Sequence, residues 1–211
     1  MTKKMSRERV LDAALELVDQ VGAGGLSMRK LGAALGVEAM TLYYYVPNKD
    51  AVLDGLVERV ATHAFTVVPQ AGWQHLLRDF AVSFRRELLR HPGVLHLVAT
   101  RPVATLQGLR TLEAGLAVLR ASGFGLREAC HAMNAVATFT TGHCLAEIDP
   151  PGGTPPRVPE TEPEELPNLT EAVRAGLGTP QDHQARFDFA LDALIAGLAA
   201  TAAPPLCPRS G

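Results

Sequence analysis

The sequence predicts an all-α protein of about ten helices, with an N-terminal three-helix domain followed by a larger helical domain. Apolar residues recur at helical spacing through almost the whole chain, and no stretch of useful length alternates apolar and polar residues as a strand would. Glycine and proline clusters interrupt this pattern repeatedly. Because hydrophobic residues make up 47% of the 211 residues, the chain can bury a substantial core.

The first three expected helices are short and closely spaced. One covers 6–22, and a glycine-rich stretch separates it from a second over 27–35, for which Ser27 is placed as the N-cap. Gly36 interrupts the second helix, and a third covers roughly 39–45. Helices this short are marginal in isolation, so packing against one another must stabilise them.

Longer helices follow these three. Asn48 is placed to cap a fourth helix, whose apolar positions run from Leu53 to Ala64. Further breaks of glycine, proline or serine lie at 91–93, 101–102 and 122–125. The last helices are expected over about 126–148, 166–177 and 182–200.

Two segments lack the composition of a packed element. The stretch over 150–165 is rich in proline and glutamate, cannot pack a core, and is interpreted as a flexible linker. The proline-rich end from Ala203 is interpreted as a frayed tail.

The net charge does not point to nucleic acid. Charged residues make up 20% of the chain and the formal net charge is -2, so a DNA-binding surface has to be local, as in the basic cluster of Lys3, Lys4, Arg7 and Arg9. Apolar runs are short and none follows the basic N-terminus, which predicts neither a membrane helix nor a secretory signal. A reducing cytoplasm suits the three cysteines, which are odd in number and share no metal-type spacing: Cys130, Cys144 and Cys207.

The segment from Leu26 to Val46 has the pattern of a helix-turn-helix. Its two helices can cross closely because Gly32 adds no bulk where they meet and Gly36 can adopt the positive φ of the turn. One face is buried by Leu31, Leu35, Val37 and Leu42. The outer residues of the second helix are then Ala39, Met40, Thr41, Tyr43 and Tyr45, where a recognition helix meets the major groove.

An ordinary helical hairpin of a core is the alternative interpretation. The outside of such a hairpin would be charged, whereas this one carries three successive tyrosines over 43–45. Exposed aromatic residues in a row usually mark a binding surface. Tyr44, by its position, is expected in the core rather than on DNA.

Residues 6–60 resemble the DNA-binding domain of TetR-family repressors. The resemblance rests on the amphipathic first helix and on the motifs Leu26-Ser-Met-Arg-Lys-Leu31, Thr41-Leu-Tyr-Tyr-Tyr-Val46 and Asn48-Lys49. It extends to the tetracycline-repressor branch through Trp73-Gln74, Ser83-Phe84-Arg85-Arg86, Thr100-Arg101-Pro102, Gly123-Phe-Gly-Leu-Arg127 and Asn134-Ala-Val-Ala-Thr-Phe-Thr-Thr-Gly142. It covers the chain well to about residue 148 and the last two helices weakly.

The resemblance implies a ligand-responsive repressor that binds a palindromic operator as a homodimer. It implies a helix-turn-helix domain over 1–48, a connecting helix over 49–66, and a ligand-binding and dimerisation domain over 67–203. Carried over by position, the phosphate contacts are Thr41, Tyr43 and Lys49. Base edges or groove walls are faced by Arg29, Ala39, Met40 and Tyr45, with Arg29 the candidate for a bidentate contact to guanine.

In this family the C-terminal helices surround an apolar chamber that holds a small molecule through a few polar groups. The polar candidates here are His63, Thr100, Arg101 and Asn134. The apolar candidates, each of which could also be ordinary core, are Phe65, Phe80, Phe84, Leu97, Leu112, Met133, Ala137 and Phe139. Small residues on the two long helices predict a four-helix dimer bundle, with contacts at Gly142, Leu145, Ala190, Ala193 and Gly197.

The effector is expected not to be a magnesium–tetracycline complex. In the tetracycline branch a histidine three residues before the Thr of Thr-Arg-Pro holds the metal, and this chain has Leu97 there, with His96 as an alternative ligand. Phe80 replaces a polar amide, and Thr62 replaces a histidine, with His63 one step round the helix. A hard cation thus loses its direct ligand, which predicts a mostly apolar effector with a polar end.

Other functional classes find little support. His131 and His143 lie twelve residues apart with no matching partner, so neither a metal nor a cofactor is expected. No phosphate loop, Gly-x-Ser-x-Gly or His-Glu-x-x-His motif is present, which argues against an enzyme. The remaining alternative is a TetR-like activator, or a partner-binding regulator without ligand induction, because repression depends on where the operator lies.

Overall fold

The computed structural model describes residues 4–65, 72–148, 165–177 and 179–201, and all of the regular secondary structure in these ranges is helical. The expected all-α fold is confirmed, with ten α-helices and two short 3₁₀ helices in the described ranges. The expected linker lies outside these ranges except for Glu165, as does the expected tail from Ala203. Within the described part, no helix is long and apolar enough to cross a membrane.

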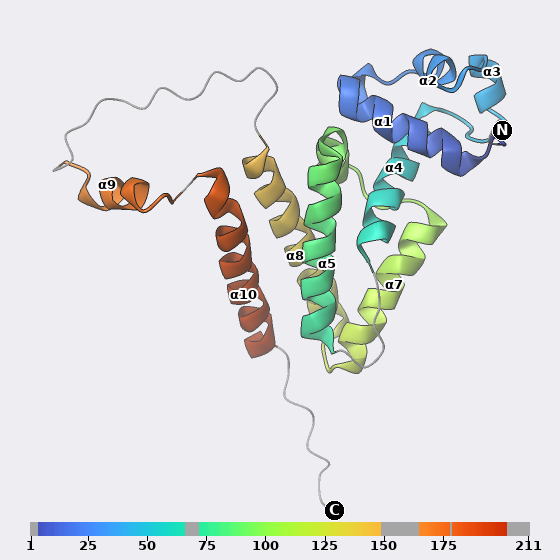
Figure 1. Ribbon diagram of the computed structural model, residues 1–211. Coiled ribbons are helices and arrows are strands. Elements are labelled where there is room, and N and C mark those ends of the chain that lie inside the picture. The colour runs from blue at the N-terminus through green and yellow to red at the C-terminus, as the bar shows by residue number, and fades with distance from the viewer. Residues whose placement is uncertain (1–3, 66–71, 149–164, 178, 202–211) are drawn as a thin grey trace, which may run out of the picture.

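The N-terminal domain consists of three helices and the start of a fourth, drawn in blue and cyan at the top of Figure 1. The helices are α1 (Arg7–Gly25), α2 (Met28–Leu35), α3 (Ala39–Leu42) and α4 (Lys49–Ala64). Side-chain oxygens of Ser27 and Asn48 accept hydrogen bonds from the amides of Lys30 and Ala51, as expected of N-caps. Gly22, where the first helix was expected to end, has a non-helical φ of 72° and kinks α1.

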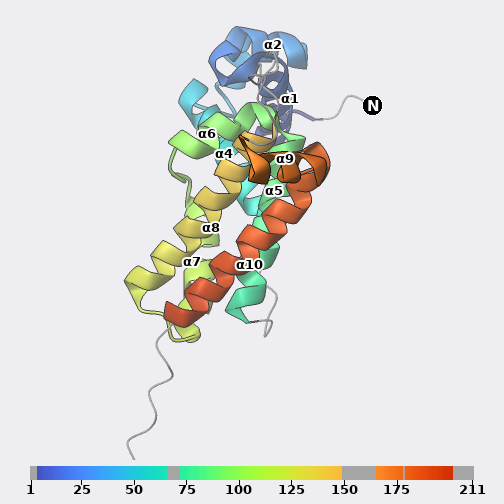
Figure 2. The ribbon, with the colours of Figure 1, turned by 90° about the vertical axis from the view of Figure 1, so that its left-hand side faces the viewer.

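The C-terminal part contains the remaining elements. They are α5 (Trp73–Arg90), the 3₁₀ helix η1 (Pro92–Val94), α6 (Leu95–Thr100), α7 (Leu106–Ala121), α8 (Leu126–Glu147), α9 (Pro167–Arg174), η2 (Pro180–Asp182) and α10 (His183–Thr201). The expected breaks at 91–93, 101–102 and 122–125 all separate helices. α10 packs along α5 and α8, while α9 lies near its N-terminal end (Figures 1 and 2).

Two clusters of buried side chains hold these helices together. One contains the core of α1–α4 and continues without interruption into α5 and α6 through Phe84, Leu88 and Leu95. The other joins α5, α7, α8 and α10 around Phe187, which is fully buried. Because the first cluster spans both parts of the chain, the N-terminal domain is packed onto the C-terminal helices through apolar contacts.

A close backbone contact fixes α1 against the turn after α5. Gly93 lies so near α1 that a Cβ on it would stand 2.3 Å from the carbonyl oxygen of Val18. The Asp19 carboxylate accepts hydrogen bonds from the Gly93 amide at 3.1 Å and from His91 Nδ1 at 2.7 Å. A glycine is required here because any side chain would push α1 away from η1.

Candidate DNA-binding surface and ligand cavity

The turn between α2 and α3 has the geometry expected of a helix-turn-helix. Gly36 has a φ of 69°, and a Cβ on Gly32 would stand 2.8 Å from the carbonyl oxygen of Val37. Both expectations for these glycines are confirmed. Leu31 and Leu42 are fully buried, so the two helices share one apolar face and turn the other outward.

The residues expected to contact DNA differ in exposure, and Arg29, Met40 and Tyr43 lie on the outward face of this motif. Arg29 is exposed on α2, and Met40 is 74% exposed on α3. Tyr43 is exposed immediately after α3. The half-buried members of the set are Ala39, Thr41, Tyr45 and Lys49.

The tyrosine run differs from the expectation. Tyr44, expected in the core, is 88% exposed, so that expectation was wrong. Tyr45 instead packs against the core. The reason is that α3 ends at Leu42, whose carbonyl oxygen accepts from the amides of both Tyr45 and Val46, so 43–45 form a turn rather than a continued helix. The spacing of a helix therefore no longer decides which tyrosine faces inward.

A cavity of about 770 Å³ lies among α4, α5, α6, α7 and α8. Nine of the twelve expected ligand residues line it: Phe65, Phe80, Phe84, Thr100, Arg101, Leu112, Met133, Asn134 and Ala137. Its volume falls within the range of small-molecule sites, and most of the lining side chains are apolar.

The other three expected residues lie elsewhere. Leu97 is buried in the first core cluster, and Phe139 stacks on Phe187 with ring centroids 5.5 Å apart. His63 is exposed and borders a separate polar hollow between α1, α4 and the end of α5. Helical spacing alone missed the lining residues Val57, Ala61, Leu116, Cys130 and Thr138, because small and aliphatic side chains look the same in a core and in a cavity wall.

Aromatic rings form one wall of the cavity. The rings of Phe80 and Phe84 are stacked with centroids 5.1 Å apart, and Phe65 meets Phe80 edge-on at 5.7 Å. Such a surface favours a flat apolar or aromatic ligand, because it offers ring faces and edges but few hydrogen bonds. The side-chain amide of Asn134 has no hydrogen-bond partner within the described ranges, so it is available to a ligand.

Arg101 connects the cavity wall to α4. Its Nη1 donates to Asp54 Oδ1 at 2.5 Å, and its Nη2 donates to Asp50 Oδ1 at 2.6 Å. The hydrogen bond to Asp50 is the main cause that raises the pKa of Arg101, and Asp54 adds to it. α4 begins at Lys49, so this ion pair ties the cavity wall to the helix that follows the DNA-binding motif.

Two family models match the chain. The model described as "Bacterial regulatory proteins, tetR family" matches residues 10–56, and the model described as "Tetracyclin repressor-like, C-terminal domain" matches residues 68–202. The chain belongs to the TetR family. The helix-turn-helix of this TetR-family protein is therefore a DNA-binding module, and the protein is a transcriptional regulator rather than an enzyme.

Individual relatives agree with this assignment. The chain is 39% identical to the class D tetracycline repressor protein of Escherichia coli over 198 residues, which cover 92% of this chain and 89% of the relative. It is 34% identical to an HTH-type transcriptional regulator of Saccharopolyspora erythraea over 206 residues, covering 94% and 86%. The structure of Streptomyces coelicolor ActR in complex with actinorhodin superimposes with a TM-score of 0.77 at 26% identity, covering 96% and 100%.

The TetR-family protein leaves one face of its two long C-terminal helices open. Phe189 on α10 is 78% exposed, and Ala193 and Gly197 follow it at four-residue steps, so the three share a face. Ala190, next to this face, is half-buried. On α8, Gly142 and Leu145 are exposed and also border the cavity.

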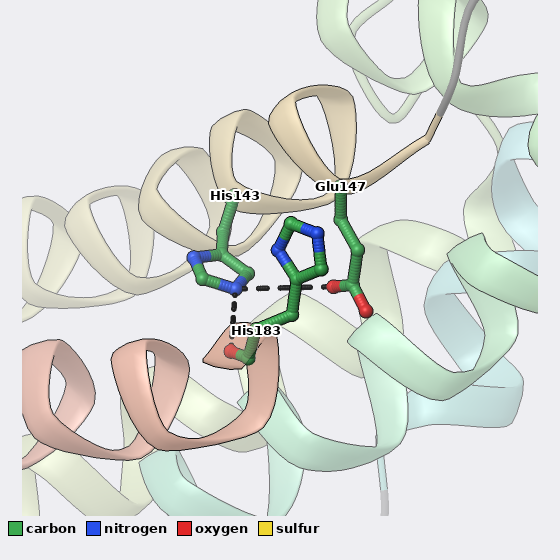
Figure 3. Close-up of side chains that lie close together, drawn as sticks. All are labelled: His143, Glu147 and His183. Atoms are coloured by element: carbon green, nitrogen blue, oxygen red, sulfur yellow. Dashed lines mark hydrogen bonds and ion pairs between the residues drawn. The ribbon is translucent and has the colours of Figure 1, made fainter. Parts of the chain in front are cut away.

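A cluster of polar side chains joins the end of α8 to the start of α10 (Figure 3). His143 Nε2 lies 3.2 Å from the carbonyl oxygen of His183 and 3.8 Å from Glu147 Oε2. Burial lowers the pKa of His143. Spacing along the sequence does not predict this grouping, because His183 is forty residues from His143.

Donor atoms of His143, Glu147 and His183 lie within 4.8 Å of one another, the geometry of a potential metal site. Their other contacts argue against one. Arg85 donates two hydrogen bonds to the Glu147 carboxylate, from Nη2 to Oε1 at 2.7 Å and from Nε to Oε2 at 2.9 Å. Arg186 contacts His183 Nδ1. Because two guanidinium groups already engage the donors, their charge repels a cation. We interpret the cluster as an ion-pair clasp between α5, α8 and α10.

Proposed function

We propose that this protein is a repressor that binds a near-palindromic operator as a homodimer in the cytoplasm and releases it when a small, mostly apolar molecule enters the cavity. The proposal rests on one observation, that α4 lines the cavity and also adjoins the helix-turn-helix. Val57 and Ala61 of α4 line the cavity, and the same helix begins at Lys49 beside the helix-turn-helix. A ligand that moves α4 therefore moves the DNA-binding surface.

The dimeric part of the proposal follows from the size of the recognition element. α3 has four residues, so one copy reaches too few base pairs for useful specificity. The open face of α8 and α10 supports association, because a Cβ on Gly142 or Gly197 would meet nothing within 4 Å in the same chain. Two copies packed through these helices would form a four-helix bundle.

The cavity also supports an effector other than a magnesium–tetracycline complex. Among the described residues that line it, none is histidine, aspartate or glutamate. A related structure is that of a class A TetR with 5a,6-anhydrotetracycline and magnesium, at 28% identity and a TM-score of 0.65, covering 93% of this chain and 99% of that one. This chain places Leu97 in the core and His96 exposed outside the cavity, so neither supplies a metal ligand there.

Selection of binding sequences from a random DNA pool tests the operator proposal. The expected result is an inverted repeat whose half-sites lie about one helical turn apart. A single unrepeated site bound by a monomer would contradict it. Operator release is then titrated with tetracycline in the presence and absence of magnesium. The proposal expects no magnesium-dependent release at micromolar drug, and such release would refute the effector class.

A further inference from the structure

We propose that the effector is an apolar organic acid whose anion replaces Asp50 and Asp54 on Arg101. This inference rests on the proposed ligand-binding function of the cavity, and it adds the charge of the ligand and the contact that the ligand breaks. It rests on the position of Arg101 at the cavity, on the lack of other charged side chains among the described residues of its lining, and on the exposure of Asp50 and Asp54.

Arg101 stands at the point where the cavity meets its partners on α4. Asp54, Val57 and Ala61 follow one another at spacings of three and four residues, so they share one face of the helix. Val57 and Ala61 line the cavity, and Asp54 lies one turn further along this face, about 5 Å away. A ligand that reaches Val57 is therefore within one helical turn of the guanidinium.

Arg101 is the single charged residue among the described residues that line the cavity. The other polar members are four threonines, an asparagine and a cysteine, and three of the four threonine hydroxyls donate to carbonyl oxygens of their own helices. An anionic group thus has one strong partner in the cavity, whereas a cationic group has none. In an apolar enclosure that charge–charge contact is stronger than in water.

The present partners of Arg101 can be displaced. Asp50 is 74% exposed and Asp54 31% exposed in their side chains, so both return to water readily when released. Each carboxylate uses only one nitrogen of the guanidinium, so a ligand carboxylate that displaces both can bind the planar fork through two parallel hydrogen bonds. An acid held by the aromatic wall would gain this bidentate contact in place of two single ones.

Displacement of Asp50 and Asp54 by a ligand anion would release α4 from Arg101. Arg101 follows α6 directly and is anchored by its amide, which donates to the Leu97 carbonyl oxygen at 2.8 Å. Loss of its bonds to Asp50 and Asp54 would remove the ionic tie between α6 and the first turns of α4. The ligand anion is thereby coupled to the helix-turn-helix, and by linkage a protein without that tie should bind the anion more tightly.

Two fluorescent probes of nearly the same shape separate charge from apolar binding. Anilinonaphthalene sulfonate is an anion, and N-phenylnaphthylamine is its neutral analogue. Both are titrated into the wild-type full chain, into Arg101→Gln, and into the double variant Asp50→Asn/Asp54→Asn. Arg110→Gln on α7, which is exposed and does not line the cavity, is the matched control for loss of one positive charge. Ala137→Trp, which fills the cavity, shows where the probes bind.

The expected outcome is a pair of opposite shifts for the anion only. Arg101→Gln should weaken sulfonate binding about tenfold, whereas the double aspartate variant should tighten it by about threefold to tenfold. The neutral probe should change by less than about twofold in both variants, and Arg110→Gln should match the wild type for both probes. Retained binding of the neutral probe also shows that each variant is folded.

Two other outcomes are informative in different ways. Unchanged sulfonate binding in Arg101→Gln, or weaker binding in the double aspartate variant, would overturn the acid proposal while leaving an apolar ligand cavity in place. Binding of neither probe to the wild type, or binding that Ala137→Trp leaves intact, would overturn both the acid proposal and the ligand-binding function proposed for this cavity.

Discussion

Arg101 Nη1 donates to Asp54 Oδ1 over 2.5 Å, so a side chain of the cavity wall is tied to the helix that follows the DNA-binding motif. A second tie joins α1 to the residue that follows α5, where Asp19 accepts from His91 at 2.7 Å. Together they hold α1 and α4 against the C-terminal helices. Of these residues, Arg101 lines the cavity and His91 does not, so the proposed route from the ligand to the helix-turn-helix runs through Arg101 and α4.

The DNA surface is tested by two variants with different signatures. Lys49→Ala should weaken binding to all sequences alike and reduce the slope of log K against log salt by about one, because a phosphate contact is lost. Arg29→Ala should relax the preference at one base pair, at about 1–3 kcal/mol. Fluorescence anisotropy with cognate and single-substituted operators separates the two effects. Equal behaviour of both variants and the wild type would remove these residues from the DNA-binding surface.

The dimer face is tested by charge insertion. Gly197→Asp or Ala193→Asp should yield monomers, because a carboxylate buried between two apolar helices without a partner costs several kcal/mol. Ala117→Asp makes a comparable change at an exposed position of α7, a helix outside the proposed interface, and should leave the dimer intact. Sedimentation velocity reports the mass. A dimer that persists in both α10 variants would place the interface elsewhere.

The contact between η1 and α1 predicts an unequal cost for two glycine substitutions. Gly93→Ala should lower the free energy of unfolding by about 1–3 kcal/mol, because its Cβ would collide with the Val18 backbone, which cannot move without shifting α1. Gly24→Ala meets nothing within 4 Å and should be close to neutral. Urea denaturation measures both. Equal effects of the two substitutions would mean that α1 is free to move away from η1.

The clasp between α8 and α10 predicts a dependence of stability on pH. Burial lowers the pKa of His143 below its ordinary value of 6.5, and Arg85 and Arg186 add to this, while Glu147 and the His183 carbonyl oppose it. As pH falls below 6.5, the unfolded chain gains a proton that the folded chain resists, so the free energy of unfolding decreases. His143→Gln should remove this part of the loss, whereas His131→Gln, at an exposed position on the same helix, should not. Urea titrations at about pH 7 and about pH 5.5 compare the variants, and an identical loss in His143→Gln and the wild type would exclude His143 as its source.

Local signals in the sequence predicted local features well. The caps at Ser27 and Asn48 and the positive φ of Gly36 depend on residues within one turn, so the sequence alone specifies them. Tyr44 was assigned to the core because helical spacing was extended beyond Leu42, where the helix gives way to a turn.

Spacing along the sequence cannot predict contacts between distant segments. The bonds from Arg101 to Asp50 and Asp54 span about fifty residues of sequence, so the spacing within one helix does not pair these residues. A signal did exist on α4, where Asp54 shares a face with Val57 and Ala61 and is therefore an acid at the edge of an apolar surface. Whether an apolar residue such as Leu97 lies in the core or in the cavity wall likewise depends on tertiary packing.

Ligand-driven release of DNA is tested most directly by operator anisotropy in the presence of a cavity ligand. The ligand is a compound that raises the melting temperature of the wild type but not that of Ala137→Trp. The expected result is loss of operator binding by the wild type on addition of the compound, while Ala137→Trp binds the operator with or without it. Unchanged operator affinity of the wild type at saturating compound would contradict a ligand-released repressor and favour a regulator that does not respond through this cavity.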